Sequence, residues 1–172
     1  VDYIGDTAAF EADIAGHAAI ARTLGPYKLS LHSGSDKFSI YPAAMRQTRG
    51  RVHLKTAGTS YLEGLHTIAA IDPAFLKEVY VFSRERYETD KQSYHVSAQL
   101  EKAPSPEEVT NWIALLDQFD AREIFHVAFG SVLTDPVLYP RYMQILRDNA
   151  EAYAENLKIH FIHHLSSFTK QG

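Results

Sequence analysis

Hydrophobic and polar positions along the chain follow two periods, one typical of helices and one typical of strands. Residues 8–25 carry apolar side chains at roughly helical spacing from Phe10 to Leu24, and a Gly-Pro pair ends the pattern at Pro26. Residues 28–34, with the sequence KLSLHSG, alternate polar and apolar side chains at every second position. The first period predicts an amphipathic helix, and the second predicts a strand.

The same two periods recur along the rest of the chain. Further strands are predicted at residues 49–58, 93–100 and 122–130. Further helices, several with a capping residue or an early proline, are predicted at residues 60–71, 74–88 and 105–119, and from about residue 138 to about residue 166. Strands that alternate with helices indicate crossover connections and a parallel sheet.

The predicted strands are apolar on one face and polar on the other. The polar face carries, strand by strand, Lys28, Ser30 and His32, then His53 and Lys55, then His95 and Ser97, then His126. A doubly wound sheet is covered on both faces and should be apolar on both. A barrel fits better, because helices cover only its outside. Since a closed barrel usually has eight strands, we expect an α/β, TIM-barrel-like fold: about half a barrel of four parallel strands with flanking helices.

Composition narrows the class of protein. With 172 residues and 45% hydrophobic content, residues 1–172 are most simply one domain. The net charge of -4 is mild and the basic residues are scattered, which argues against nucleic acid and a membrane surface as partners. Without a long apolar run or a leader, we expect a soluble, cytoplasmic protein. The chain has no cysteine, which excludes disulfides and thiolate zinc sites. Its first residue is Val1 rather than methionine, which suggests processing or a fragment of a longer protein.

Each predicted strand places one histidine on the polar face, namely His32, His53, His95 and His126. Neighbouring parallel strands lie about 4.8 Å apart, so these imidazoles could converge on one ion. Neutral imidazole suits zinc, nickel, cobalt, iron or manganese. The alternative is a polar core in which each histidine only bonds to a neighbour. We expect at least two of them to act as ligands or acid/base groups.

Other polar residues lie at the carboxyl ends of the first two predicted strands. Lys55 could clamp a substrate carboxylate, stabilise an enolate or transfer a proton; a buried ion pair is the alternative. Two small polar turns, SGS at residues 33–35 and TAGTS at residues 56–60, could present amides and hydroxyls to an anion, although such turns are often simple loops. His160, His163 and His164 have near-helical spacing in the last predicted helix, but without a facing ligand they rank lower as a metal site.

Five segments together resemble the tagaturonate epimerase family: residues 2–6 (DYIGD), 27–42, 51–65, 94–99 and 124–133. LHSGSDKF and HLKTAGTSYLE are the most specific of these motifs. Because members of the family are longer, the chain resembles their carboxyl-terminal half. The resemblance implies a metal-dependent barrel enzyme that interconverts tagaturonate and fructuronate in hexuronate breakdown.

The matching motifs contain His32, Asp36, Lys37, His53, Lys55 and His95. We expect His32, His53 and His95 to bind a divalent metal ion, which would be zinc, nickel, manganese, cobalt or iron. Catalytic roles are expected for Asp36, Lys55 and His126. Substrate binding is expected for Ser33, Ser35, Lys37 and Thr59, with a small ketouronate or ketose as the substrate.

The chemistry of this reaction can be reasoned independently. The two ketouronates differ at a hydroxyl-bearing carbon β to the ketone, whose proton is not acidified, so simple enolisation cannot invert it. Retro-aldol cleavage, rotation of the aldehyde and re-addition would invert it without a redox cofactor. A metal would polarise the ketone, Asp36 or a histidine would take the hydroxyl proton, and Lys55 would sit beside the forming oxyanion or the carboxylate.

Two rival functions remain open from the sequence. One is a related metal-dependent sugar isomerase or aldolase with a different substrate. The other is an inactive, truncated half-barrel whose histidines fill a polar core. An unclosed half-barrel exposes strand edges, so the expected partner is a second copy in a homodimer or the missing amino-terminal half.

Overall fold

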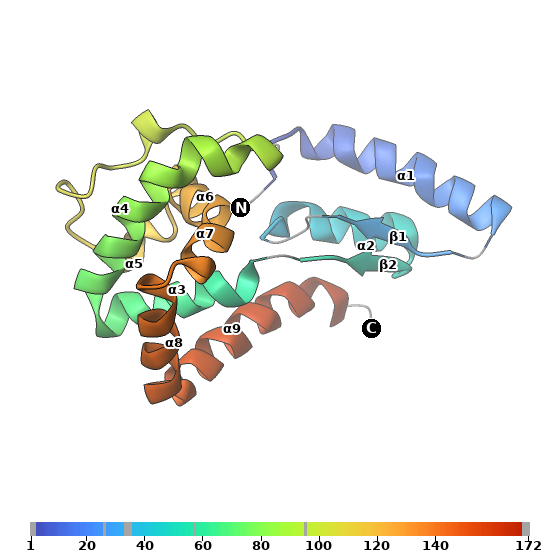
Figure 1. Ribbon diagram of the computed structural model, residues 1–172. Helices are drawn as coiled ribbons and strands as arrows, with labels where there is room; N and C mark the ends of the chain where they lie inside the picture. The colour runs from blue at the N-terminus through green and yellow to red at the C-terminus, as the bar shows by residue number, and fades with distance from the viewer. Residues whose placement is uncertain (1–2, 26, 33–35, 57, 95, 170–172) are drawn as a thin grey trace. The chain divides into compact units, whose positions relative to one another are not determined.

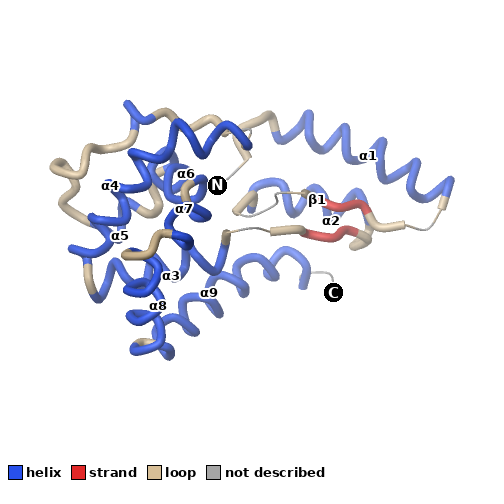
Figure 2. The backbone as a smooth tube through the Cα atoms, viewed as in Figure 1, coloured by secondary structure: helices blue, strands red, loops and turns tan. Residues whose placement is uncertain are grey.

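The computed structural model describes residues 3–25, 27–32, 36–56, 58–94 and 96–169, and the chain is an α/β protein in which helices dominate. Figure 2 shows strand only at β1 (Leu29–Leu31) and β2 (Val52–Leu54) within this described part. The chain divides into two compact units. Unit 1 comprises Val1–Ala57 and Ile159–Gly172, and unit 2 comprises Gly58–Lys158.

Unit 1 opens with helix α1 (Thr7–Leu24), which confirms the first predicted helix. The Asp6 carboxylate caps it by accepting hydrogen bonds from the backbone N–H groups of Ala8 and Ala9. The 3-10 turn η1 (Phe38–Ile40) and helix α2 (Tyr41–Thr48) connect β1 to β2. Helix α1 packs against α2, and α1 also contacts β1 while α2 contacts β2 (Figure 1).

Strands β1 and β2 pair in parallel, as the alternating pattern predicted. Leu29 pairs with Val52, Ser30 with His53 and Leu31 with Leu54. Ser30 and His53 therefore share one face, where the serine Oγ lies 3.1 Å from Nδ1 of the histidine. Both side chains on this polar face are exposed, whereas the paired apolar residues are buried or half-buried.

Unit 2 is helical in its described residues. Its elements are α3 (Thr59–Ile71), α4 (Pro73–Asp90), η2 (Lys91–Ser93), η3 (Leu100–Lys102), α5 (Trp112–Leu115), α6 (Phe119–Val127), α7 (Phe129–Thr134) and α8 (Leu138–Asp148). The predicted helices at 60–71 and 74–88 are thus confirmed as α3 and α4. Fully buried Phe75, Tyr80 and Phe125 belong to one hydrophobic core formed by these helices.

The last predicted helix is two helices. Helix α8 ends at Asp148. The backbone of the following residue, Asn149, leaves the helical region, and its N–H and side-chain amide both donate to the carbonyl of Ile145. Helix α9 (Ala150–Thr169) follows, and it begins in unit 2 and ends in unit 1. The asparagine satisfies the carbonyl at the end of α8, which is why the helix can stop there.

The predicted strand at residues 122–130 is wrong, because these residues belong to α6 and α7. Ala121, Ile124, Phe125 and Ala128 are all fully buried, and their spacing is that of one helix face. The Gln118 side chain caps α6 by accepting from the N–H of Ala121 at 2.6 Å. The aromatic and β-branched residues here suggested a strand, but burial of one helix face and the cap at Gln118 stabilise a helix instead.

The strand predicted at residues 93–100 is also wrong within its described part, since residues 96–99 have no regular structure. Side chains take the place of a neighbouring strand. Glu123 accepts from the N–H of Ala98 at 2.8 Å, Asp120 accepts from the N–H of Gln99 at 2.9 Å, and Tyr87 donates to the carbonyl of Ala98. The N–H groups of Ala98 and Gln99 and the carbonyl of Ala98 are therefore satisfied without a sheet.

The predicted helix at 105–119 is reduced to the short α5. Glu108 folds back to accept from the N–H of Ser105, and Asn111 caps α5 by accepting from Ile113 and Ala114. These local side-chain bonds compete with a continuous helix. With four strands predicted and two present in the described residues, the four-stranded half-barrel is not confirmed.

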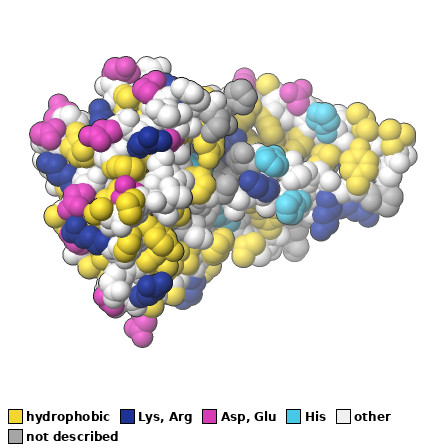
Figure 3. All heavy atoms as spheres, in the orientation of Figure 1, with side chains coloured by type: hydrophobic (Ala, Val, Ile, Leu, Met, Phe, Trp, Pro, Cys, Tyr) yellow, Lys and Arg dark blue, Asp and Glu magenta, His cyan; other side chains and the backbone are white. Residues whose placement is uncertain are grey.

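The surface drawn in Figure 3 intersperses acidic and basic side chains over unit 2 on that face. This agrees with the scattered charges and the net charge of -4 in the sequence. Among the described residues, no helix is both long enough and apolar enough to cross a membrane.

A glycine lets two helices of unit 2 approach closely, and it generates a testable prediction. A methyl group at buried Gly64 in α3 would overlap the hydroxyl of Tyr142 in α8 and lie 3.1 Å from Leu146. We expect Gly64→Ala to lower the free energy of unfolding by about 1–3 kcal/mol through overpacking, measured by urea denaturation.

The matched control is Gly16→Ala in α1, where a methyl group meets nothing within 4 Å. There the higher helix propensity of alanine should raise the free energy of unfolding by about 0.5–1 kcal/mol. If both substitutions stabilise the protein, the close approach of α3 and α8 is wrong.

Candidate metal centre

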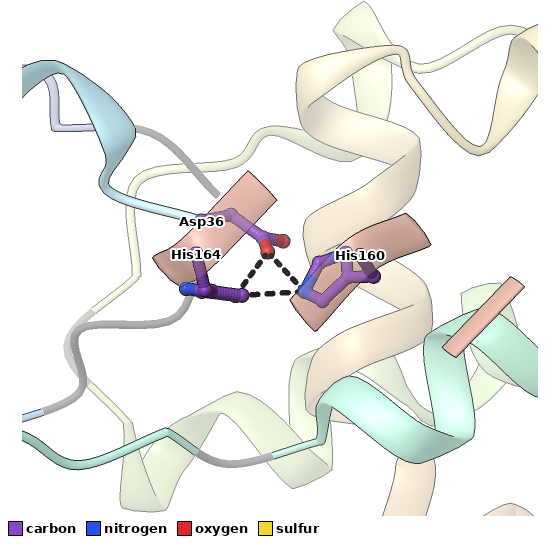
Figure 4. A group of neighbouring side chains, drawn as sticks. All are labelled: Asp36, His160 and His164. Carbon is purple, nitrogen blue, oxygen red and sulfur yellow. Dashed lines mark hydrogen bonds and ion pairs between the residues drawn. The ribbon is translucent and has the colours of Figure 1, made fainter. Parts of the chain in front are cut away.

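The structure brings one predicted catalytic residue, Asp36, together with two histidines of α9. Figure 4 shows the Asp36 carboxylate and the His160 and His164 imidazoles pointing toward one another. Oδ1 of Asp36 lies 3.3 Å from Nε2 of His160 and 3.8 Å from Nε2 of His164. The two Nε2 atoms are 2.7 Å apart. All three residues belong to unit 1.

The local backbone explains how Asp36 reaches this position. It adopts a left-handed conformation with φ of 60°, which is uncommon for residues other than glycine but more readily accepted by Asp and Asn. Its side chain is buried, with 6% of the residue surface exposed. Lys37 follows and leads into η1, so the chain turns immediately after presenting the carboxylate.

The two histidines share a face of α9 because they are four residues apart. His164 is buried, and His160 is half-buried. The neighbouring side chains of α9 that point elsewhere are apolar and exposed, namely Ile159, Phe161, Ile162 and Leu165. The helix therefore turns its imidazoles toward Asp36 and leaves its large apolar groups outside.

Aromatic side chains surround the imidazoles. Phe38 stacks on His163 with ring centroids 3.8 Å apart and planes inclined by 13°, and its ring centroid lies 4.8 Å from that of His164. The Tyr41 hydroxyl lies 3.0 Å from Nδ1 of His164. These contacts hold the ring of His164 so that its Nε2 atom faces the other two groups.

Burial and neighbouring charge favour the neutral form of His164. Desolvation is the largest cause, and together with the nearby His160 it lowers the pKa of His164 to about 4, although the Asp36 carboxylate acts in the opposite direction. A neutral imidazole has a free nitrogen lone pair, which is what a metal ion requires.

The donor set fits a divalent metal ion. Two atoms bound at about 2.0–2.1 Å to a tetrahedral zinc ion stand about 3.3 Å apart, and the three separations in this cluster are 2.7, 3.3 and 3.8 Å. Two imidazoles and one carboxylate suit zinc, iron, manganese, cobalt or nickel. Three protein ligands also leave coordination positions for a substrate, as catalytic sites do and closed structural sites do not.

The other predicted site residues do not join this cluster. His32 follows β1 and is exposed, and His53 lies exposed in β2 against Ser30. Within the described part of the chain, Asp36, His160 and His164 form the one group of three such ligands. Ser33, Ser35 and His95 lie outside the described residues. The metal-binding roles of His32, His53 and His95 thus stay predictions.

Lys55, Thr59 and His126 have distinct environments. Lys55 is half-buried directly after β2, and its N–H donates to the carbonyl of Leu31. Thr59 is the buried first residue of α3. His126 lies in α6 rather than in a strand, and its ring packs against Gly58, where an added methyl group would lie 2.8 Å from Nε2. Their catalytic and binding roles stay predictions.

Sequence reasoning ranked His160 and His164 low because it found no facing ligand. Their spacing of four residues was the available signal, and the acidic group that faces them in the structure is Asp36, for which the sequence predicted a catalytic role. A groove of about 490 Å³ in unit 2, lined mainly by apolar residues such as Val81, Phe82 and Leu138, includes none of the predicted site residues.

Comparison with known proteins connects this chain to sugar-acid enzymes. A family model described as tagaturonate epimerase matches residues 1–168. The tagaturonate/fructuronate epimerase of Thermotoga maritima is 44% identical over 167 residues, which cover 96% of this chain and 35% of that protein.

Solved structures of the fructuronate-tagaturonate epimerase from Cohnella laeviribosi are similar to this chain. The native crystal structure gives a TM-score of 0.92 at 35% identity and covers 97% of this chain and 36% of that one. A structure of the same enzyme with one glycerol also gives 0.92, at 34% identity. This chain therefore spans about a third of the length of these relatives, and it belongs to the tagaturonate epimerase family.

Proposed function

We propose that this chain carries the metal centre of an enzyme that interconverts tagaturonate and fructuronate. The observation that carries the proposal is the convergence of Asp36, His160 and His164 on one point in a member of the tagaturonate epimerase family. The names of the relatives supply the substrate, a ketouronate. The cluster supplies the ligands for a divalent metal ion.

We propose that the fold of the whole enzyme is a larger parallel barrel to which this chain contributes part. Two parallel strands of three residues each make a small sheet by the standards of folded proteins. The relatives are about three times longer than this chain, so they have the length to extend such a sheet. We also propose that this chain is a single domain of that barrel and that the enzyme is cytoplasmic. In this proposal the chain pairs with a second copy or with further sequence.

The reaction inverts one hydroxyl-bearing carbon by retro-aldol cleavage. A base takes the hydroxyl proton, the oxygen electron pair forms an aldehyde carbonyl, and the adjacent carbon–carbon bond breaks. The electrons of that bond pass to the ketone and give an enediolate. After the aldehyde rotates, the enediolate attacks its other face, the bond re-forms and the proton returns, so all atoms and electrons balance.

The predicted site residues have separate roles in this reaction. A divalent ion in the cluster would supply Lewis-acid polarisation of the ketone. Asp36 serves as a ligand in this proposal, so the base is one of the histidines, for which His126 is the sequence-based candidate. Lys55 places a cation near the developing oxyanion or the substrate carboxylate. Ser33, Ser35, Lys37 and Thr59 keep their predicted role in binding the substrate.

The metal site generates the first prediction of this proposal. The variants Asp36→Asn, His160→Gln and His164→Gln should each weaken zinc binding by more than about 100-fold. This loss exceeds the effect of removing a residue that only hydrogen-bonds to a metal ligand. Asn is accepted in the left-handed region, so Asp36→Asn removes the charge with little backbone cost. Competition with a chromophoric chelator measures the affinity.

His17→Gln in α1 is the matched control, because His17 is exposed on a different helix. It should bind zinc as the wild type does. Undiminished affinity in all three cluster variants would mean that the metal, if bound, is held elsewhere.

The reaction itself is tested with each ketouronate in heavy water. We expect conversion of tagaturonate to fructuronate to retain hydrogen at the inverted carbon, because retro-aldol cleavage never breaks that carbon–hydrogen bond. Proton NMR of the product measures it. Deuterium at the inverted carbon would contradict the retro-aldol route, and turnover of neutral ketoses in preference to ketouronates would favour a related sugar isomerase or aldolase.

Lys55 generates a prediction about electrostatics. Lys55→Met keeps an unbranched side chain that is one atom shorter and removes its charge, so zinc binding should persist while kcat falls by at least about 100-fold. Lys28→Met, at an exposed lysine before β1, is the control and should leave kcat unchanged. Full activity of Lys55→Met would remove this lysine from the mechanism.

A further inference from the structure

Tyr41 holds the side of His164 that faces away from the metal cluster. It is the first residue of α2, and its side chain is fully buried, with 0% of the residue surface exposed. Its hydroxyl lies 3.0 Å from Nδ1 of His164, while Nε2 of the same ring faces His160 and Asp36. One imidazole thus connects a buried phenol to the cluster.

The Tyr41 hydroxyl can form a hydrogen bond with either neutral tautomer of the His164 imidazole. When Nε2 gives its lone pair to a metal ion, a neutral imidazole carries its proton on Nδ1 and donates it to the Tyr41 oxygen. When Nε2 of His164 instead carries the proton and donates it to His160, Nδ1 becomes an acceptor, and the Tyr41 hydroxyl can donate to it. A hydroxyl can take either part, whereas an apolar ring would leave a buried nitrogen unsatisfied.

We infer that Tyr41 is a positioning residue for the metal centre, an inference that rests on the proposed function. Through its hydrogen bond to Nδ1, Tyr41 fixes the rotation of the His164 imidazole so that Nε2 points at Oδ1 of Asp36 and Nε2 of His160. Hydrogen-bond partners of metal-binding histidines typically contribute about 10–100-fold to metal affinity.

Packing alone does not account for this contact. The ring of His164 also lies near Phe38, with centroids 4.8 Å apart, and the ring of Tyr41 lies 5.8 Å from both His164 and Phe168. These contacts restrict where the imidazole sits, but they are apolar and cannot choose between its two nitrogens. The hydroxyl is the group that distinguishes Nδ1 from the carbon atoms of the ring.

Tyr41→Phe in the full chain separates the hydroxyl from the packing. We expect the variant to bind zinc about 10–100-fold more weakly than the wild type in chelator competition. In the zinc-loaded wild type, nitrogen NMR should show a proton on Nδ1 of His164 that exchanges slowly with water. In Tyr41→Phe that proton should exchange faster.

Tyr142→Phe is the matched control, because Tyr142 is also buried and donates from its hydroxyl to the carbonyl of Tyr61 in unit 2. It loses a buried hydrogen bond of the same kind, so it reports the general effect on stability. We expect its zinc affinity to equal that of the wild type.

The outcomes separate this inference from the proposed function. If the wild type binds zinc and Tyr41→Phe binds it equally well, the positioning role is wrong and the metal site stands. If Tyr142→Phe weakens zinc binding as much as Tyr41→Phe does, the effect is one of stability and the positioning role is again wrong. If the wild type binds no zinc, manganese, cobalt, nickel or iron, the metal site is wrong and the inference fails with it. A zinc-loaded wild type without a protected Nδ1 proton overturns the inference even if the variant does not fold.

Discussion

The buried contact between the Asp36 carboxylate and the imidazoles of α9 is the constraint on which unit 1 depends. A carboxylate removed from water costs several kcal/mol unless hydrogen bonds or opposite charges replace the lost hydration. Asp36 also occupies the left-handed region, which adds a backbone cost of about 1–2 kcal/mol. The end of α9 must therefore return to the segment that carries Asp36. This return is long-range in sequence, since the nearby Tyr41 is 123 residues away from its hydrogen-bond partner His164.

Sequence patterns were sufficient to predict the structure of segments whose own residues determine it. The helix predicted at 8–25 and the pairing of the first two strands are of this kind, because capping, periodicity and alternation are all encoded within each segment. The predicted strand at 122–130 failed because the run IFHVAF is compatible with both periods. Burial of Ala121, Ile124 and Ala128 on one face resolved the ambiguity, and burial is a property of the folded chain.

In the candidate site, too, features within one segment could be predicted from the sequence, whereas contacts between distant segments could not. Asp36 was a candidate site residue from its motif, and the spacing of His160 and His164 was visible in the sequence. Their combination was not, because nothing in one sequence indicates which residues meet across such a distance. The catalytic role of Asp36 stays a prediction, and the role of metal ligand proposed above rests on the two imidazole nitrogens that its carboxylate faces.

The cluster is built so that a proton and a metal ion compete for the same place. With their Nε2 atoms 2.7 Å apart, His160 and His164 can be in contact only if a proton lies between the two nitrogens. A metal ion must displace that proton, because both nitrogens need their lone pairs free to bind it. Burial, which lowers the pKa of His164 to about 4, weakens the hold on an additional proton and so favours the metal. The Asp36 carboxylate opposes this effect on the histidine pKa, but its negative charge attracts a divalent cation more strongly than it attracts a single proton's charge at the same separation. Electrostatics in this cluster therefore favours a divalent ion, whereas the 2.7 Å separation of the two Nε2 atoms fits the shared proton. Binding a zinc ion requires these two nitrogens to move apart to about 3.3 Å.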